Sequence, residues 1–112
     1  MIARNEAAFL DQCLRSVRGL VDQIAVVDTG SADVTGEVAH RHGAQVFSHA
    51  WQRDFSLARN LALEQATGDW VLVLDCDEVL SAADHARLRR LLQTPGPMAY
   101  RLTTRNYTNQ TN

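Results

Sequence analysis

Several features that would place this chain in a special class of protein are missing from its sequence. No apolar run approaches the ~18 residues that cross a membrane, and the first residues lack the apolar core of a signal peptide. The only two cysteines, Cys13 and Cys76, form neither a CxxC pair nor a spacing that suggests zinc. These absences predict a cytoplasmic protein with reduced thiols and no membrane span.

Lysine is absent as well, so all 11 basic residues are arginines. The formal net charge is -2, and the arginines form no basic stripe of the kind that counterion-driven binding needs. We therefore expect no nucleic-acid partner. The content of 46% hydrophobic and 21% charged residues is ordinary for a globular protein, and 112 residues suit a single domain.

Strand-like and helix-like segments alternate along the chain. Apolar spacing and end signals predict helices within residues 5–20, 31–43, 51–68 and 81–93, the last opened by a Ser81 cap. Apolar or alternating runs predict strands at residues 1–3, 23–28, 44–49, 69–75 and 98–107. This alternation predicts an α/β fold, with an open, mainly parallel sheet and helices on both faces.

The strongest of these predicted strands ends in acidic residues. Residues 70–74 are an unbroken apolar run, and Asp75, Asp77 and Glu78 follow at once; Asp28 ends another apolar run in the same way. Open parallel sheets bind ligands beyond the carboxyl ends of their strands, so we expect these carboxylates in one crevice. Mg²⁺ or Mn²⁺ uses one or two carboxylates and takes water and phosphate oxygens as its other ligands. The pattern is consistent with a site for a metal ion that neutralises the charge of a diphosphate.

Each of these residues also has a purely structural interpretation. Two acids beside a turn are often only solvated, and Asp28 could cap the turn that follows it. Glu6 could lie in the first turn of a helix, where the helix dipole favours it, and Arg59 could pair with Asp54 or Glu64 on a helix surface. Trp51 and Trp70 are expected to pack in the core or against the sheet rather than to contact a sugar.

Several blocks of the sequence, in order and at matching spacing, carry a resemblance to a known family. They are "MIARNEAAFLDQCLRSV", "VDQIAVVDTGSADVT" and "DFSLARNLALEQATGDWVLVLDCDEVL". Together they resemble the nucleotide-binding half of family 2 glycosyltransferases with the GT-A fold. The nearest resemblance is to bacterial chains that read "MIVRNE", "DTGSTDGT", "DFSAARN" and "DADE". It covers residues 1 to about 80 and implies transfer of a sugar, with inversion, from a nucleotide-diphosphate sugar to an unknown acceptor.

The resemblance also implies which residues bind the donor. They are Ala3, Arg4, Asn5, Glu6, Asp28, Arg59, Asn60 and Asp75, with Asp75 and Asp77 as the ligands of Mg²⁺ or Mn²⁺. The first four match the segment along the nucleoside, and Asp28 matches the carboxylate that receives hydrogen bonds from the base. Arg59 matches a residue near the base or the diphosphate. Asp77 is the better candidate for direct metal contact, and Glu78 is expected to support it.

Family members continue beyond the Asp-x-Asp element into a half that supplies the acceptor contacts and the catalytic base. We therefore expect the 112 residues to be a fragment or truncated form, with the catalytic base outside this chain. One alternative is a non-catalytic nucleotide-binding or assembly module that pairs with a second copy as a homo-oligomer. Another is a phosphatase of the haloacid dehalogenase type, but that family needs a downstream lysine.

Overall fold

A small parallel sheet organises the chain. The computed structural model describes residues 1–107, and its three strands lie in the order β1 (Ile2–Ala3), β2 (Ala25–Asp28) and β3 (Gln45–Ser48). Ile2 pairs with Val27, and Val27 pairs with Phe47 on its other side, all in parallel register. The three strands therefore end at the same edge, as the predicted crevice requires.

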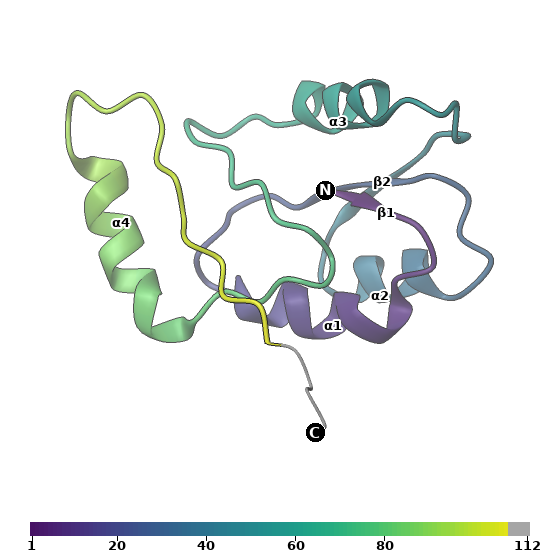
Figure 1. Cartoon of the computed structure of the whole chain (residues 1–112), viewed down its shortest axis with the longest axis horizontal. Coiled ribbons are helices and arrows are strands. Elements are labelled where there is room, and N and C mark those ends of the chain that lie inside the picture. Colours follow the sequence, from purple (N-terminus) through teal and green to yellow (C-terminus); the bar gives the residue numbers. More distant parts are fainter. Residues whose placement is uncertain (108–112) are drawn as a thin grey trace.

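Helices cover both faces of this sheet (Figure 1). Helices α1 (Ala7–Ser16) and α2 (Thr35–Arg41) lie on one face, and α3 (Phe55–Glu64) lies on the other. Successive strand residues point to opposite faces. Accordingly, Val26 packs in a cluster with Leu10 of α1, whereas Val27 packs with Ala58 of α3. The predicted α/β class, with an open parallel sheet between helices, is confirmed.

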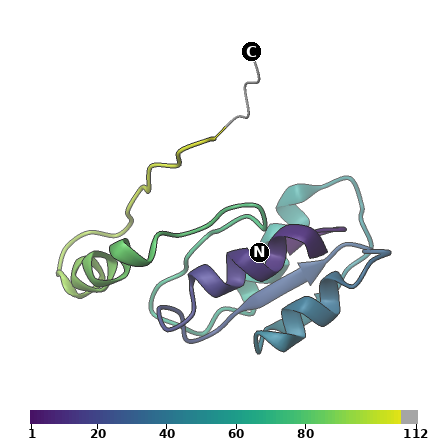
Figure 2. The same cartoon turned by 90° about the horizontal axis from the view of Figure 1, so that it is seen from below.

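Within the described residues, the chain from Ser81 onward forms a separate arm. The 3-10 turn Ala82–Asp84 leads into α4 (His85–Gln93), which lies apart from the sheet in both views (Figures 1 and 2). Ser81 precedes this turn without a side-chain capping bond, so its predicted capping role is wrong. The ring of His85 is 2.7 Å from the carbonyl oxygen of Ser16, which ties the arm to the end of α1.

Two predicted strands are wrong, because residues 69–75 and 98–107 form no strand in the structure. β1 is only two residues long, so it has few backbone N–H and C=O groups with which the apolar segment 69–75 could pair. The carbonyl of Ile2 accepts a bond from Cys76 Sγ at 3.4 Å, where a strand neighbour would donate a backbone N–H. The apolar run consequently stays partly in solvent, with Val73 57% exposed.

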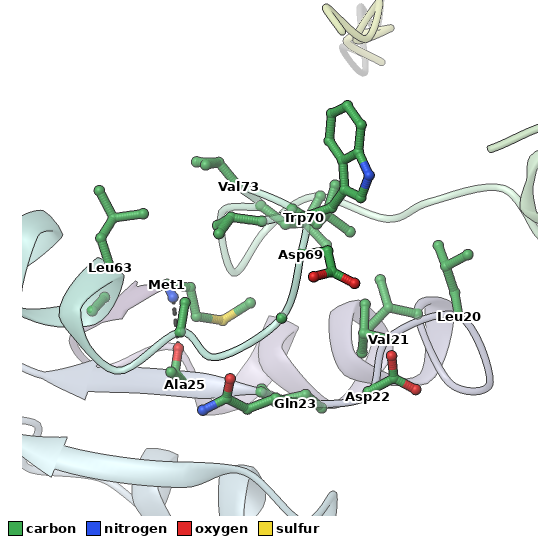
Figure 3. Close-up of a pocket in the computed structure, with 18 of the residues that line it drawn as sticks. Met1, Leu20, Val21, Asp22, Gln23, Ala25, Leu63, Asp69, Trp70 and Val73 are labelled. Atoms are coloured by element: carbon green, nitrogen blue, oxygen red, sulfur yellow. Dashed lines mark hydrogen bonds between the residues drawn. The ribbon is translucent and has the colours of Figure 1, made fainter. Parts of the chain in front are cut away.

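A large apolar cavity lies under this unpaired segment (Figure 3). Its volume is about 810 Å³, and its lining includes Met1 and residues of α1, α3 and α4. Figure 3 shows Trp70 and Val73 on the segment above the space, with Leu20 and Val21 below it. The segment therefore covers the edge of the sheet loosely instead of extending it.

Candidate functional site

A second cavity, of about 570 Å³, lies where the strands of the sheet end. It is lined by Ile2, Arg4, Glu6, Thr29, Trp51, Phe55, Arg59, Asp75, Cys76 and Asp77. These residues come from β1, from the segments that follow β1 and β2, from α3 with the loop before it, and from the turn Asp75–Glu78. Five of the predicted site residues thus line one space, and they supply it with two cationic and three acidic side chains.

The acidic turn from Asp75 to Glu78 is closed by a reciprocal pair of hydrogen bonds. The Asp75 N–H donates to Glu78 Oε1 at 2.8 Å, and the Glu78 N–H donates to the Asp75 carbonyl at 3.0 Å. Between them, Cys76 is buried against β1, while the Cys13 thiol of α1 donates to the Asp75 carbonyl at 3.4 Å. The turn is thus anchored from below, and Asp75 and Asp77 are left exposed at the cavity.

Arg59 reaches this turn from α3. Its Nη2 is 3.9 Å from Asp75 Oδ1, with the two side chains 39% and 66% exposed. The alternative pairings with Asp54 or Glu64 are wrong, because within residues 1–107 Arg59 faces Asp75 instead. Asp54 Oδ1 caps α3 and accepts from the Ser56 and Leu57 N–H groups at 2.9 and 3.3 Å. An exposed pair at this distance contributes little stability. The guanidinium therefore remains available to an anionic ligand.

Asp28 has the turn role that its sequence allowed. Its Oδ1 accepts from the Gly30 and Ser31 N–H groups at 3.1 and 2.8 Å. Its Oδ2 is directed to α2, 3.9 Å from the place that a Cβ on Gly36 would occupy. The next residue, Thr29, lines the cavity, but Asp28 does not. Its contact with a base stays a prediction.

Three other predicted donor-binding residues are also absent from the lining. Ala3 is buried, and its carbonyl accepts from the Thr29 N–H at 3.0 Å. Asn5 has a left-handed backbone with φ 52°, and its Oδ1 accepts from the Ala32 N–H at 2.7 Å. Both residues hold the loop after β1 against the loop after β2. Asn60 is exposed on α3.

Trp51 and Phe55 are cavity residues that were not predicted for the site. Trp51 was expected in the core or against the sheet, but it is only half-buried, and Phe55 is 71% exposed. Their rings are 4.7 Å apart at an interplanar angle of 63°. Asp54 caps α3, which makes Phe55 its first residue and places it beside the strand ends. The Asp54 cap was the sequence signal that could have indicated this position for Phe55, because the first apolar residue of a helix need not face the core.

The Asp75 and Asp77 carboxylates suit a hard divalent ion that also binds substrate and water, rather than an ion held by protein ligands alone. Residues 1–107 contain no group of three or more His, Cys, Asp or Glu side chains arranged to hold a metal. Asp75 and Asp77 offer two exposed carboxylates in one cavity, which suits Mg²⁺ or Mn²⁺ when phosphate and water supply the other ligands. Hard ions of this kind take oxygen ligands rather than sulfur, and Cys76 is buried, with a pKa that burial raises to about 12.

Comparison with known proteins identifies the family of this chain. Residues 1–111 match the model described as glycosyl transferase family 2. The chain belongs to glycosyltransferase family 2. The family match favours this assignment over the phosphatase alternative, and the resemblance that the sequence motifs carry is confirmed.

Curated relatives are found in several bacteria. A TPR repeat-containing protein of Synechococcus elongatus is 47% identical over 100 residues, which are 89% of this chain and 25% of that protein. An uncharacterized glycosyltransferase of Rickettsia felis is 36% identical over 72% of this chain and 28% of its own length. The SPbeta prophage-derived glycosyltransferase SunS of Bacillus subtilis is 29% identical over 81% and 22%, respectively. The chain thus spans about a quarter of the length of these relatives. No helix within residues 1–107 is long and apolar enough to cross a membrane.

Proposed function

We propose that this chain is the donor-binding part of a glycosyltransferase that transfers a sugar, with inversion, from a nucleotide-diphosphate sugar to an acceptor. One observation carries the proposal beyond family membership: Asp75 and Asp77 line the same cavity as Arg4 and Arg59, beyond the ends of the parallel strands. Ligand sites of open α/β sheets lie at this position. Both thiols are free and buried, which supports a cytoplasmic setting.

The acidic turn would hold the metal. Asp77 and Asp75 are the proposed ligands of Mg²⁺ or Mn²⁺, and Glu78 fixes the turn that carries them. When bound, the ion would supply positive charge for the departing diphosphate. Arg59 faces the same turn, where its guanidinium can donate to phosphate oxygens.

The nucleoside would lie along the loop after β1. Arg4 and Glu6 of this loop line the cavity, whereas Ala3 and Asn5 fix its path. Asp28 is the proposed contact to the edge of the base; Oδ1 is used by the turn, and Oδ2 would have to turn from α2 toward the cavity to reach it. Asn60, next to Arg59, completes the proposed donor-binding set. We assign no catalytic base within the 112 residues.

Calorimetric titration of the whole chain tests the proposal. UDP, GDP and their sugar conjugates are added with Mg²⁺ or Mn²⁺ present, and then with a chelator in excess. We expect nucleotides of only one of the two bases to bind. Their affinity should fall at least tenfold once the metal is removed. Adding the metal alone provides the control for heat from the ion. Absence of binding by all of these nucleotides, to a chain shown to be folded, would contradict the proposed donor site.

A further inference from the structure

We propose that Trp51 and Phe55 form a stacking surface for the nucleobase of the donor. The inference rests on the proposed function and deepens it, because it names the groups that hold the face of the base. Both side chains line the same cavity as Asp75 and Asp77. Neither is needed for the core clusters, which take up other residues of the sheet and of α3.

The local structure holds this aromatic pair in place. The loop before α3 is tied to the end of β2 by the bond from the His49 N–H to the Asp28 carbonyl at 2.9 Å. Arg53 then adopts a left-handed backbone with φ 57°, and the Asp54 cap starts α3 directly after it. A non-glycine residue in that region costs energy, so the path of the loop is imposed by its surroundings.

The exposure of Phe55 inside the cavity favours a ligand with an apolar face. At 71% exposure the ring leaves most of its apolar surface in water, although it packs edge-on against Trp51 at 4.7 Å. A flat aromatic ligand would remove that surface from water and stack on a ring face. Stacking of a base on an aromatic side chain strengthens binding by about one to two orders of magnitude.

The rest of the cavity indicates what else such a ligand carries. Phe55 and Arg59 are four residues apart on α3, so they lie on one face of the helix. Arg59 is in turn 3.9 Å from Asp75 on the acidic turn. An aromatic surface is thus followed by a cation and then by two carboxylates suited to a metal. A nucleoside diphosphate has the matching order, with a planar base at one end and a metal-binding diphosphate at the other.

Binding and fluorescence together test this inference. The chain has two tryptophans, so a Trp70→Phe background leaves Trp51 as the single reporter. UDP, GDP and inorganic pyrophosphate are titrated with Mg²⁺, which is not paramagnetic, and each is followed by calorimetry and by Trp51 fluorescence. Phe55→Ala is compared with Phe55→Tyr, which keeps a ring, and with Phe9→Ala, which removes a ring 55% exposed on α1 and outside the cavity lining.

We expect the preferred nucleoside diphosphate to quench Trp51 and pyrophosphate to bind without quenching it. Phe55→Ala should weaken nucleoside diphosphate binding about tenfold and leave pyrophosphate unchanged, while Phe55→Tyr and Phe9→Ala stay within twofold of the parent. Unquenched binding of the nucleoside diphosphate, with Phe55→Ala at parent affinity, overturns the stacking surface and leaves the donor site standing. An equal loss of nucleoside diphosphate and pyrophosphate affinity in Phe55→Ala assigns Phe55 to the diphosphate end of the site and also overturns it. Absence of binding by any of these ligands removes the donor site and the inference together.

Discussion

Glu78 and Asp75 hold each other through two hydrogen bonds. The Glu78 carboxylate accepts from the Asp75 N–H at 2.8 Å, and the Asp75 carbonyl accepts from the Glu78 N–H at 3.0 Å. The glutamate therefore uses one carboxylate oxygen to fix the backbone that carries Asp75 and Asp77. Its expected supporting role in the acidic element follows from this contact.

Replacing Glu78 should affect metal binding through geometry. Glu78→Ala removes the acceptor of the Asp75 N–H, so we expect a stability loss of about 1 kcal/mol and several-fold weaker binding of Mn²⁺ with nucleotide. Glu78→Gln keeps an oxygen that can accept the same bond and should restore most of the affinity. Calorimetry of both variants measures this. If Gln is as damaging as Ala, the charge of Glu78 matters rather than its position.

Asp28 is predicted to have two separable roles. Asp28→Ala removes the acceptor of the Gly30 and Ser31 N–H groups, so we expect the free energy of unfolding to fall by about 1–2 kcal/mol. A base contact through Oδ2 predicts in addition that nucleoside diphosphate binding weakens more than pyrophosphate binding. Denaturant unfolding and calorimetry give the two quantities. Equal losses for both ligands would confine Asp28 to the turn.

The buried thiols should be unreactive in the native protein. Burial raises the pKa of Cys13 to about 11 and of Cys76 to about 12, from a usual value of 9.0. At pH 8 the native thiolate fraction, and with it the alkylation rate by iodoacetamide, should be below that of the unfolded chain by about a hundredfold for Cys13 and about a thousandfold for Cys76. Mass spectrometry before and after unfolding measures it. Rapid native labelling of either cysteine would contradict the burial of the acidic turn against β1.

The same shifts set a direction for stability against pH. Each folded pKa lies above the unfolded value, so folding favours the protonated thiol. This contribution is fully present below about pH 9 and is lost as pH rises through about 11 to 12. Cys13→Ala and Cys76→Ala should each flatten the alkaline fall in the free energy of unfolding. An unchanged alkaline slope in both variants would assign that fall to other groups.

A matched pair of valines tests the packing of the apolar segment. Val73 is 57% exposed, so Val73→Ala should change the free energy of unfolding by no more than about 0.5 kcal/mol. Val27 is fully buried between α3 and its strand neighbours, and Val27→Ala should cost about 2 kcal/mol. Thermal or denaturant unfolding compares them. Equal costs would mean that residues 69–75 are packed like a strand in solution.

The sequence predicted those parts of the fold that depend on local pattern. The alternation of Val26 and Val27 between two helical layers follows from period-two side-chain placement, and the helices follow from apolar spacing. It failed for residues 69–75, because an apolar run becomes a strand only when a neighbour supplies backbone partners. β1, with two residues, does not supply them. Whether residues 69–75 form a strand therefore depends on the length of β1, which the apolar sequence of that segment does not reveal.

The site was predictable to a similar extent. Strand-end position and family motifs pointed to Asp75, Asp77, Arg59, Arg4 and Glu6, and the structure brings these five to one cavity. Motif matching alone could not tell that Asn5 uses its side chain to hold a neighbouring loop. Phe55 lies within the matched block, but an apolar residue on a helix is ordinarily expected to face the core, so it was not marked as a site residue, and Trp51 was likewise expected to pack. Phe55 lies at the cavity because it is the first residue of α3, directly after the Asp54 cap.

The metal dependence of nucleotide binding by Asp77→Asn tests the central claim most directly. Asp77 is exposed, so this change should alter the free energy of unfolding by no more than about 0.5 kcal/mol. Asp69→Asn, an exposed carboxylate outside the donor cavity, is the matched control. We predict that Asp77→Asn loses the gain in nucleotide affinity that Mg²⁺ or Mn²⁺ confers, while Asp69→Asn keeps it. A folded Asp77→Asn variant that binds nucleotide with the full metal dependence of the parent would contradict the account.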